Sequence, residues 1–264
     1  MDSLPGLNLA TFAFARWLPF IMLVSTRVGV AFASMPAPLG SLAPVQIRAA
    51  LTFALTAIFA MVYGPMQTPI PIEPSALVTA AAGEALVGAV IGLTVRVVLA
   101  AAEVAGTVAS FAMALGFAHS IDPNFGENSS PPTHLLAFLS TLMFFIFNGH
   151  HAVFSALGSS LELVPPGHVL SAAFGDDAFS MGSRMMARGL QIAAPVLGTM
   201  MIVQIGLALA SRAAPKVHLM YLSFAVSIGA GVLTMFVAGP SLANAIAAEI
   251  RQLPEMLASA LGGV

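Results

Sequence analysis

Histidine and serine are the residue types in this chain that could do chemistry, as metal ligands or as the base and nucleophile of an enzyme. His150 and His151 are adjacent, so on a helix they point about 100° apart and cannot easily hold one ion together. No H-E-x-x-H pattern or carboxylate partner accompanies them, and the chain has no cysteine. The sequence also lacks a G-x-S-x-G motif, a P-loop and a dinucleotide fingerprint. We therefore predict no enzyme, no catalytic residue, no metal site and no cofactor.

Charged residues inside long apolar stretches are the second chemical feature: Arg16, Arg27, Glu84, Arg96 and Glu103. A bare charge at the centre of a bilayer costs at least ~2.5–3.5 kcal/mol on insertion scales. Snorkelling and ion pairs within the chain, as between Arg96 and Glu103, are one explanation. We favour the other, in which these helices pack against protein or a water-filled path. A proton relay is unsupported, because neither Glu84 nor Glu103 has a second carboxylate at close helical spacing.

A polar segment between two apolar stretches is the third feature, and it runs from Gly116 to Pro132. Its backbone would lose hydrogen-bond partners in lipid, so it must reach water, line a polar cavity or be buried in protein. Large, adaptable apolar side chains around it could form a yielding constriction. These side chains are Phe111, Met113, Leu115, Phe117 and Phe125.

The composition identifies the class of protein that positions these residues. Of 264 residues, 58% are hydrophobic and 8% are charged, whereas a soluble domain has about 25% charged residues. The chain is therefore an integral membrane protein. Its net charge of -2 provides no basic surface for nucleic acid.

The apolar runs are long and do not alternate, which favours membrane helices of about 20 residues over strands. We expect one domain with six helical regions and a polar loop over 162–183. The expected regions are residues 9–35, 49–72, 74–118, 128–161, 189–211 and 217–248, of which the second is broken at Gly64-Pro65. The N-terminus has no basic region before its apolar run, which indicates a first membrane helix and not a signal peptide.

Two short patterns concern packing and orientation. Gly88 and Gly92 form a G-x-x-x-G pattern that allows close helix approach, within the chain or to another subunit. A basic turn contains Arg212, Pro215 and Lys216. The positive-inside rule places this turn in the cytoplasm and both termini outside.

Four stretches make the chain similar to the FliR family, the flagellar export-gate proteins whose injectisome counterpart is the SctT subunit. The stretches are Arg27 to Gly29 with Met35 to Gly40 and Val45 to Arg48; Glu84 to Arg96 ending in Met113 to Ala118; Asp122-Pro123-Asn124 with Gly126, Asn128 and Asn148 to His150; and Arg212 to Pro215. The Asp-Pro-Asn version resembles flagellar members more than injectisome members. Glu103 and His119 depart from the family, because neutral polar residues are expected there.

The resemblance implies an all-α membrane protein of about six long, partly broken helices arranged as hairpins. It implies one export-gate domain over 1–264, in which 1–185 is similar to FliP and 186–264 to the hairpin and tail of FliQ. FliP-like and FliQ-like subunits would form the channel, with FlhB-like and FlhA-like export components beside it. Unfolded flagellar proteins would cross the bacterial inner membrane here, at the flagellar basal body.

The resemblance also implies that a central loop closes the pore. We expect this plug within residues 113–128, with Gly116 and Gly126 providing backbone freedom and Phe117 with Met113 the apolar seal. The plug residues would be Met113, Leu115, Gly116, Phe117, His119, Asp122, Pro123, Asn124, Phe125 and Gly126. The charges inside the apolar stretches would then serve subunit packing.

Three other functions stay open from the sequence. The first is an injectisome export-gate subunit. The second is a secondary transporter of a small solute, a class that often shows paired broken helices in two related halves. Only one clear polar break and no internal repeat is visible here. The third is an intramembrane enzyme, which has no nucleophile or metal constellation in its favour.

Overall fold

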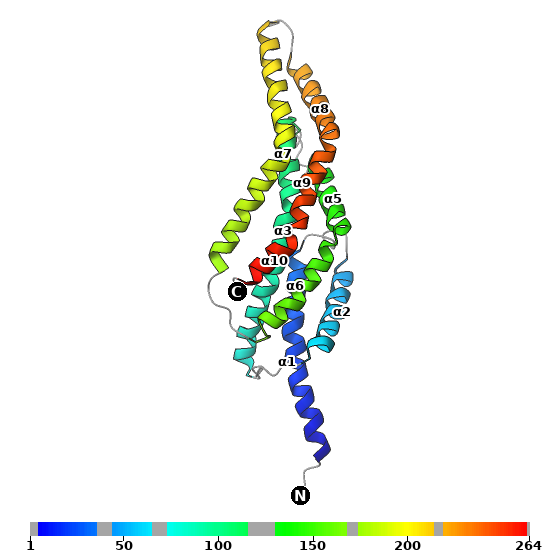
Figure 1. The fold of residues 1–264 in the computed structure, drawn as a ribbon, viewed down its shortest axis with the longest axis vertical. Helices are drawn as coiled ribbons and strands as arrows, with labels where there is room; N and C mark the ends of the chain where they lie inside the picture. The colour runs from blue at the N-terminus through cyan, green and yellow to red at the C-terminus, as the bar shows by residue number, and fades with distance from the viewer. Residues whose placement is uncertain are drawn as a thin grey trace. The chain divides into compact units, whose positions relative to one another are not determined.

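The structure is a computed structural model that describes residues 5–35, 44–64, 73–115, 130–167, 174–213 and 219–262. Side chains are described within 17–35, 44–64, 73–115, 130–167, 180–213 and 222–261. The described residues form helices and no strands (Figure 1). The helices are α1 (Pro5–Ser34), α2 (Val45–Tyr63), α3 (Pro74–Ala112), α5 (Pro131–Ile146), α6 (Gly149–Leu163), α7 (Phe174–Ala213), α8 (Leu219–Val237), α9 (Gly239–Arg251) and α10 (Leu253–Gly262). The predicted all-α fold is confirmed.

Four of the described helices contain stretches long and apolar enough to cross a membrane. These stretches are Trp17–Ser34, Val45–Tyr63, Pro74–Ala112 and Ser180–Ala213. The number rises to six if α5 with α6, and α8 with α9, each make one broken span. The chain is therefore a membrane protein with four to six candidate spans.

Two helices predicted as continuous are split, and each break has a local cause. Between α5 and α6, Asn148 has φ +55°, a left-handed conformation that asparagine tolerates better than most residues. Between α8 and α9, Pro240 lacks a backbone N–H and its ring clashes with the preceding turn of a helix. In the sequence, the polar run Asn148-Gly149-His150 indicates a polar contact or a helix irregularity at the first break, whereas only Gly239-Pro240 marks the second.

Two predicted boundaries are also wrong. The third helix ends at Ala112 and not at residue 118. The polar loop expected over 162–183 is shorter, because α7 begins at Phe174.

The chain divides into two compact units that do not follow chain order. Unit 1 comprises residues 1–96, 149–179 and 253–264, and unit 2 comprises 97–148 and 180–252. The predicted division into a FliP-like part and a FliQ-like part, at residue 185, stays a prediction.

In unit 1, α1 packs against α2, and α10 packs against α6 (Figure 1). α2 ends where Gly64 has φ +58° and its N–H donates to Ala60 O at 3.0 Å. The buried apolar residues of this unit are Phe20, Leu23, Val24, Val28, Val87, Ile91, Leu157, Leu161, Leu253 and Leu257, among others.

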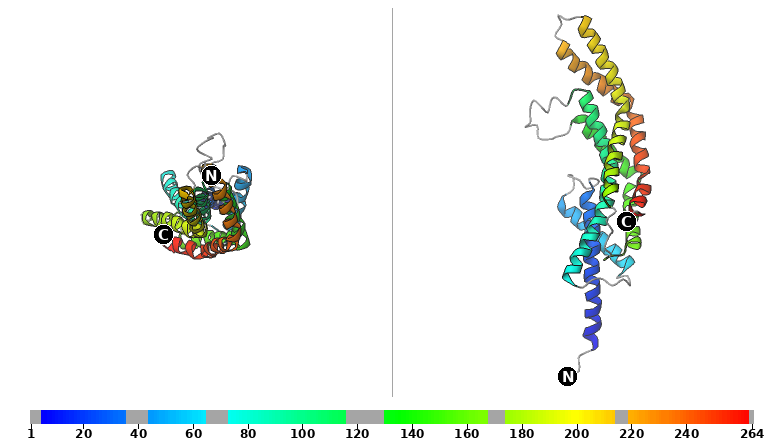
Figure 2. Two further views of the ribbon diagram at one scale, coloured as in Figure 1. Left: turned by 90° about the horizontal axis from the view of Figure 1, so that it is seen from above. Right: turned by 90° about the vertical axis from the view of Figure 1, so that its left-hand side faces the viewer.

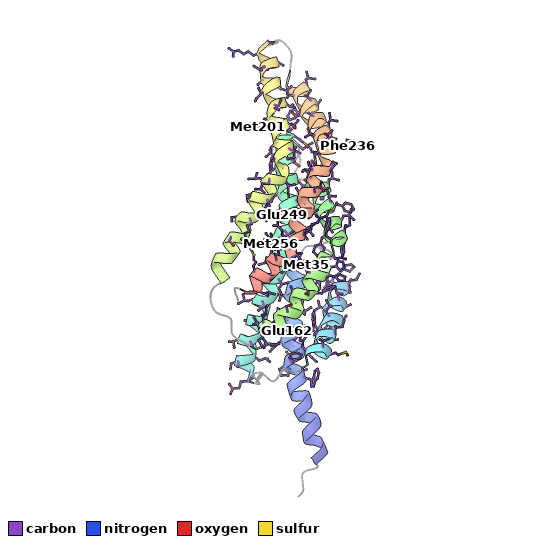
Figure 3. The ribbon with its side chains drawn as sticks, viewed as in Figure 1. Met35, Glu162, Met201, Phe236, Glu249 and Met256 are labelled. Carbon is purple, nitrogen blue, oxygen red and sulfur yellow. The ribbon has the colours of Figure 1, made fainter. Side chains whose placement is uncertain are left out.

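In unit 2, α5 and α8 both pack against α9. The second half of α7 and helix α8 run side by side as a hairpin (Figures 1 and 2). Met201 on α7 and Phe236 on α8, both labelled in Figure 3, are 64% and 84% exposed. The buried apolar residues of this unit include Leu99, Ala105, Met113, Phe144, Ile192, Val196, Met200, Leu242, Ile246 and Ile250.

Candidate functional site

The structure describes the chain before the polar segment up to Leu115, and the last residues of the segment from Ser130 onward. Most of the predicted plug lies outside the described residues. The plug residues outside them are Gly116, Phe117, His119, Asp122, Pro123, Asn124, Phe125 and Gly126. The geometry of the site is therefore described through the end of α3 and the start of α5.

Helix α3 stops in a defined way just before the polar segment. Ala114 has φ +62°, its N–H donates to Phe111 O at 3.0 Å, and the N–H of Leu115 donates to Ser110 O at 3.0 Å. This pair of hydrogen bonds is the Schellman pattern, which normally places glycine in the left-handed position. An alanine there costs roughly 1–2 kcal/mol of backbone strain. The strained residue lies two positions before the polar segment.

Four hydroxyl groups join the end of α3 to the start of α5, and we call Thr107, Ser110, Ser130 and Thr133 the hydroxyl cluster. The Ser110 and Ser130 hydroxyls are in direct contact. Ser130 Oγ lies 3.0 Å from Thr133 Oγ1, which lies 3.4 Å from Thr107 Oγ1. Ser110, Ser130 and Thr133 are buried. The end of α3 and the start of α5, on either side of residues 116–129, therefore meet in a buried polar contact.

Gly106 lets α5 approach the backbone of α3 at the same place. A Cβ atom at Gly106 would lie 2.5 Å from Thr133 Cα and 2.9 Å from Pro132 O. Pro131 and Pro132 occupy the first turn of α5, where a missing N–H leaves no intrahelical bond unmade. Any side chain at position 106 would push the two helices apart.

Met113 and Leu115 are the plug residues that the structure describes. Met113 is fully buried, and a Cβ atom at Gly231 of α8 would lie 2.7 Å from its sulfur. Leu115 is partly buried. Met113 therefore packs within unit 2, and its role as an apolar seal stays a prediction.

Arg27 and Glu84, two of the predicted packing charges, form a buried ion pair within unit 1. Arg27 Nε lies 2.6 Å from Glu84 Oε2, and both side chains are about 1% exposed. Arg27 also donates to Ser160 O at 2.7 Å and to Val164 O at 2.8 Å, at the end of α6. Glu84 Oε1 accepts the N–H of Gly167 at 3.1 Å. The charges are thus paired, and they bond to Val164 O and the N–H of Gly167 just beyond the end of α6.

Arg96 and Glu103 are both exposed on α3, and no ion pair joins them to each other or to another described residue. The interpretation of these two as an ion pair is therefore not supported in the described part of the chain. The side chain of Arg16 lies outside the described residues. Subunit packing by these three charges stays a prediction.

Gly88 and Gly92 face α1 within the same unit. A Cβ atom at Gly92 would lie 2.5 Å from Ala31 O and 2.6 Å from Ser34 Cβ, and one at Gly88 would overlap the carbonyl oxygen of Arg27. The G-x-x-x-G pattern therefore brings α1 and α3 together inside the chain. This close approach lies beside the Arg27–Glu84 pair.

Several contacts were missed by sequence reasoning. Arg188 Nε on α7 lies 3.1 Å from Glu249 Oε1 on α9, and Glu249, labelled in Figure 3, is nearly buried. The guanidinium of Arg251 lies 4.5 Å above the ring of Phe147. Partners so far apart in the sequence leave no spacing pattern, so only the fold reveals them.

The remaining predicted site residues are placed as follows. Arg212 is exposed in the last turn of α7, whereas Pro215 and Lys216 lie outside the described residues. The rings of His150 and His151 stack edge to face at 4.5 Å. Within the described ranges, no group of three histidine or acidic residues is arranged to hold a metal ion.

The chain matches one protein family over residues 18–253, the family described as bacterial export proteins, family 1. Three similar proteins are each named flagellar biosynthetic protein FliR. The protein from Pectobacterium carotovorum is 29% identical over 66% of this chain and 66% of its own length. The Escherichia coli K12 protein is 26% identical over 78% of this chain and 80% of its own length. The Caulobacter vibrioides protein is 26% identical over 86% of this chain and 92% of its own length.

Proposed function

Because the chain belongs to the FliR family of flagellar export proteins, we propose that it is a subunit of the flagellar type III export gate. Together with FliP-like and FliQ-like subunits it forms the channel for unfolded flagellar proteins. The gate lies in the bacterial inner membrane at the flagellar basal body. The observation that carries this proposal is the family match over residues 18–253. The names of the relatives favour a flagellum over an injectisome.

The exposed surface supports a role as one subunit among several. Arg96 and Glu103 are exposed on a helix that is otherwise apolar enough to span a membrane. Contact with lipid would cost ~2.5–3.5 kcal/mol for each charge at mid-bilayer, so contact with a protein partner is favoured. We place this part of α3 against a neighbouring gate subunit.

The α7–α8 hairpin is the proposed FliQ-like part, within residues 186–264. Its two helices expose large apolar side chains at Met201, Ile202, Val232 and Phe236. Such a surface suits lipid or a FliQ-like hairpin. The basic turn with Arg212, Pro215 and Lys216 then faces the cytoplasm, where FlhB-like and FlhA-like components stand.

Purification separates an export-gate subunit from a transporter. A tagged chain, extracted in mild detergent from its own cells, is expected to elute as a large complex with FliP-like and FliQ-like proteins. The tagged chain from cells that lack the FliP-like gene serves as the control, and it should elute at a smaller size. A monodisperse monomer that binds a small solute in both preparations would refute the proposal.

We further propose that residues 113–128 close the pore of this gate. Lipid cannot accept the segment, and the helices that flank it, α3 and α5, meet in the buried hydroxyl cluster. Deletion of residues 114–121 is expected to make the assembled gate leak ions across the inner membrane. Planar-bilayer conductance of the purified complex measures this. A deleted complex that assembles and stays as tight as the intact one would contradict pore closure.

A further inference from the structure

Glu103 carries a charge on an apolar helix, and its carboxylate has no partner in the described part of the chain. Arg96, the charge of opposite sign on the same helix, forms no ion pair with it. We propose that Glu103 binds an arginine on a helix of a neighbouring gate subunit, and this inference rests on the proposed function. The alternative surroundings are lipid and a water-filled path.

Lipid is the least suitable surrounding, because Glu103 lies well inside α3. The helix is a candidate membrane span over Pro74–Ala112. Glu103 lies nine residues before Ala112, which corresponds to about 14 Å along the helix axis. Long lysine and arginine side chains can carry a charge from such a depth towards water, but glutamate is shorter. A carboxylate inside a span is stabilised instead by a protein partner or by water.

Contacts on both sides of Glu103 leave a narrow exposed stripe along α3. On one side Gly106 meets α5, where a Cβ atom at Gly106 would lie 2.5 Å from Thr133 Cα. On the other side Val104 meets α7, where a Cβ atom at Gly189 would lie 2.6 Å from Val104 Cγ1. The exposed residues between these contacts, which we call the α3 stripe, are Glu103, Thr107 and Phe111. They lie within about 80° around the helix, a width that suits one packed helix.

The polar groups of the α3 stripe are hydrogen-bond acceptors, which identifies the chemistry of the partner. An ionised carboxylate only accepts hydrogen bonds. Thr107 Oγ1 donates its proton to Glu103 O at 2.9 Å, so towards a partner it also accepts. Arginine presents five N–H donors in a planar fork and is less strongly hydrated than lysine. An arginine at this level of the neighbouring helix therefore complements both the charge and the acceptors of the stripe.

Reversal of the charge tests the proposal in the full gate complex. The tagged chain is purified in mild detergent from its own cells, and the FliP-like and FliQ-like proteins that co-purify are measured. Glu103→Arg places two cations against each other, so recovery of at least one of these proteins should fall at least tenfold. Glu103→Gln keeps the size of the side chain but removes its charge, so it should lower recovery several-fold.

Glu162→Arg is the matched control for the reversal. Glu162, labelled in Figure 3, is exposed in the last turn of α6, where a cation is favourable. This variant should recover both partner proteins in unchanged amounts.

Folding of the variants is checked on the chain purified from cells that lack the FliP-like gene. Because Glu103 is exposed, the isolated Glu103→Arg chain should unfold within a few degrees of the unmodified chain. If this variant unfolds much earlier, Glu103→Gln decides the question, since it preserves the shape of the side chain.

A second reversal identifies the arginine. Each arginine in the membrane helices of the FliP-like and FliQ-like proteins is changed to glutamate in cells that carry Glu103→Arg. One of these changes should restore recovery to at least half of that seen with the unmodified proteins. If none of them restores it, the arginine partner is refuted.

Contact with lipid or with a water-filled path predicts a different pattern. Recovery would then be unchanged in both Glu103 variants, which would refute the inference. The proposed function would stand in that case, because the unmodified chain still co-purifies with its partners. If the unmodified chain itself recovers neither protein, the proposed function fails and the inference fails with it.

Discussion

At the scale of single residues, the charges in the apolar stretches have two different environments. Arg27 and Glu84 are buried and paired with each other, whereas Arg96 and Glu103 are exposed on α3. The sequence shows all four as costly charges but cannot show which have partners, since Arg27 and Glu84 are 57 residues apart. We therefore expect the buried pair to stabilise the chain and the exposed charges to serve assembly with other subunits.

Replacement of Arg27 should destabilise the isolated chain. Arg27→Met leaves Glu84 buried without its cation and removes the side-chain donor from Val164 O. Breaking a buried pair from one side typically costs about 3–5 kcal/mol. Thermal unfolding of the purified chain in detergent measures the loss.

Arg96→Met is the matched control for this substitution. Its side chain is exposed, so the isolated chain should unfold within about 0.5 kcal/mol of the unmodified protein. Because we place Arg96 against a partner subunit, less FliP-like protein should co-purify with this variant than with the unmodified chain. Equal destabilisation by both variants would contradict the distinction between the two environments.

At the scale of elements, hydropathy predicted the helices and their approximate positions but not where they break. Apolar runs of about 20 residues reveal membrane helices because lipid requires them. The break at Asn148 depends on one backbone angle, and the start of α7 at Phe174 lies in a polar stretch. Local conformation of this kind leaves little trace in composition.

The close approach of α1 and α3 at a glycine can be tested by substitution. Gly92→Val should separate α1 from α3, because its Cβ would already lie 2.5 Å from Ala31 O. Overpacking of a tight interface costs roughly 1–3 kcal/mol. The unfolding temperature of the isolated chain in detergent should fall accordingly.

Gly198→Val in α7 controls for helix propensity, because a Cβ atom there meets nothing within 4 Å. This variant should keep the unfolding temperature of the unmodified chain to within a few degrees. If the two glycine variants were equally stable, the close contact between α1 and α3 would not exist in the protein.

At the scale of the whole molecule, composition was sufficient to identify a membrane protein, and four stretches in a specific order indicated the FliR family. The family match over residues 18–253 confirms that family. The site could be predicted only as a segment that lipid excludes. The hydroxyl cluster could not be predicted, because it depends on which helices meet. The Schellman end of α3 could not be predicted because alanine, and not glycine, occupies its left-handed position.

The central claim is that the chain is a required subunit of the flagellar export gate, and export itself tests it most directly. Cells that lack only this chain should release no flagellar subunits into the medium, and a plasmid copy of the chain should restore release. The FliP-like and FliQ-like proteins must be present in both strains. Continued release of flagellar subunits without the chain would contradict the account.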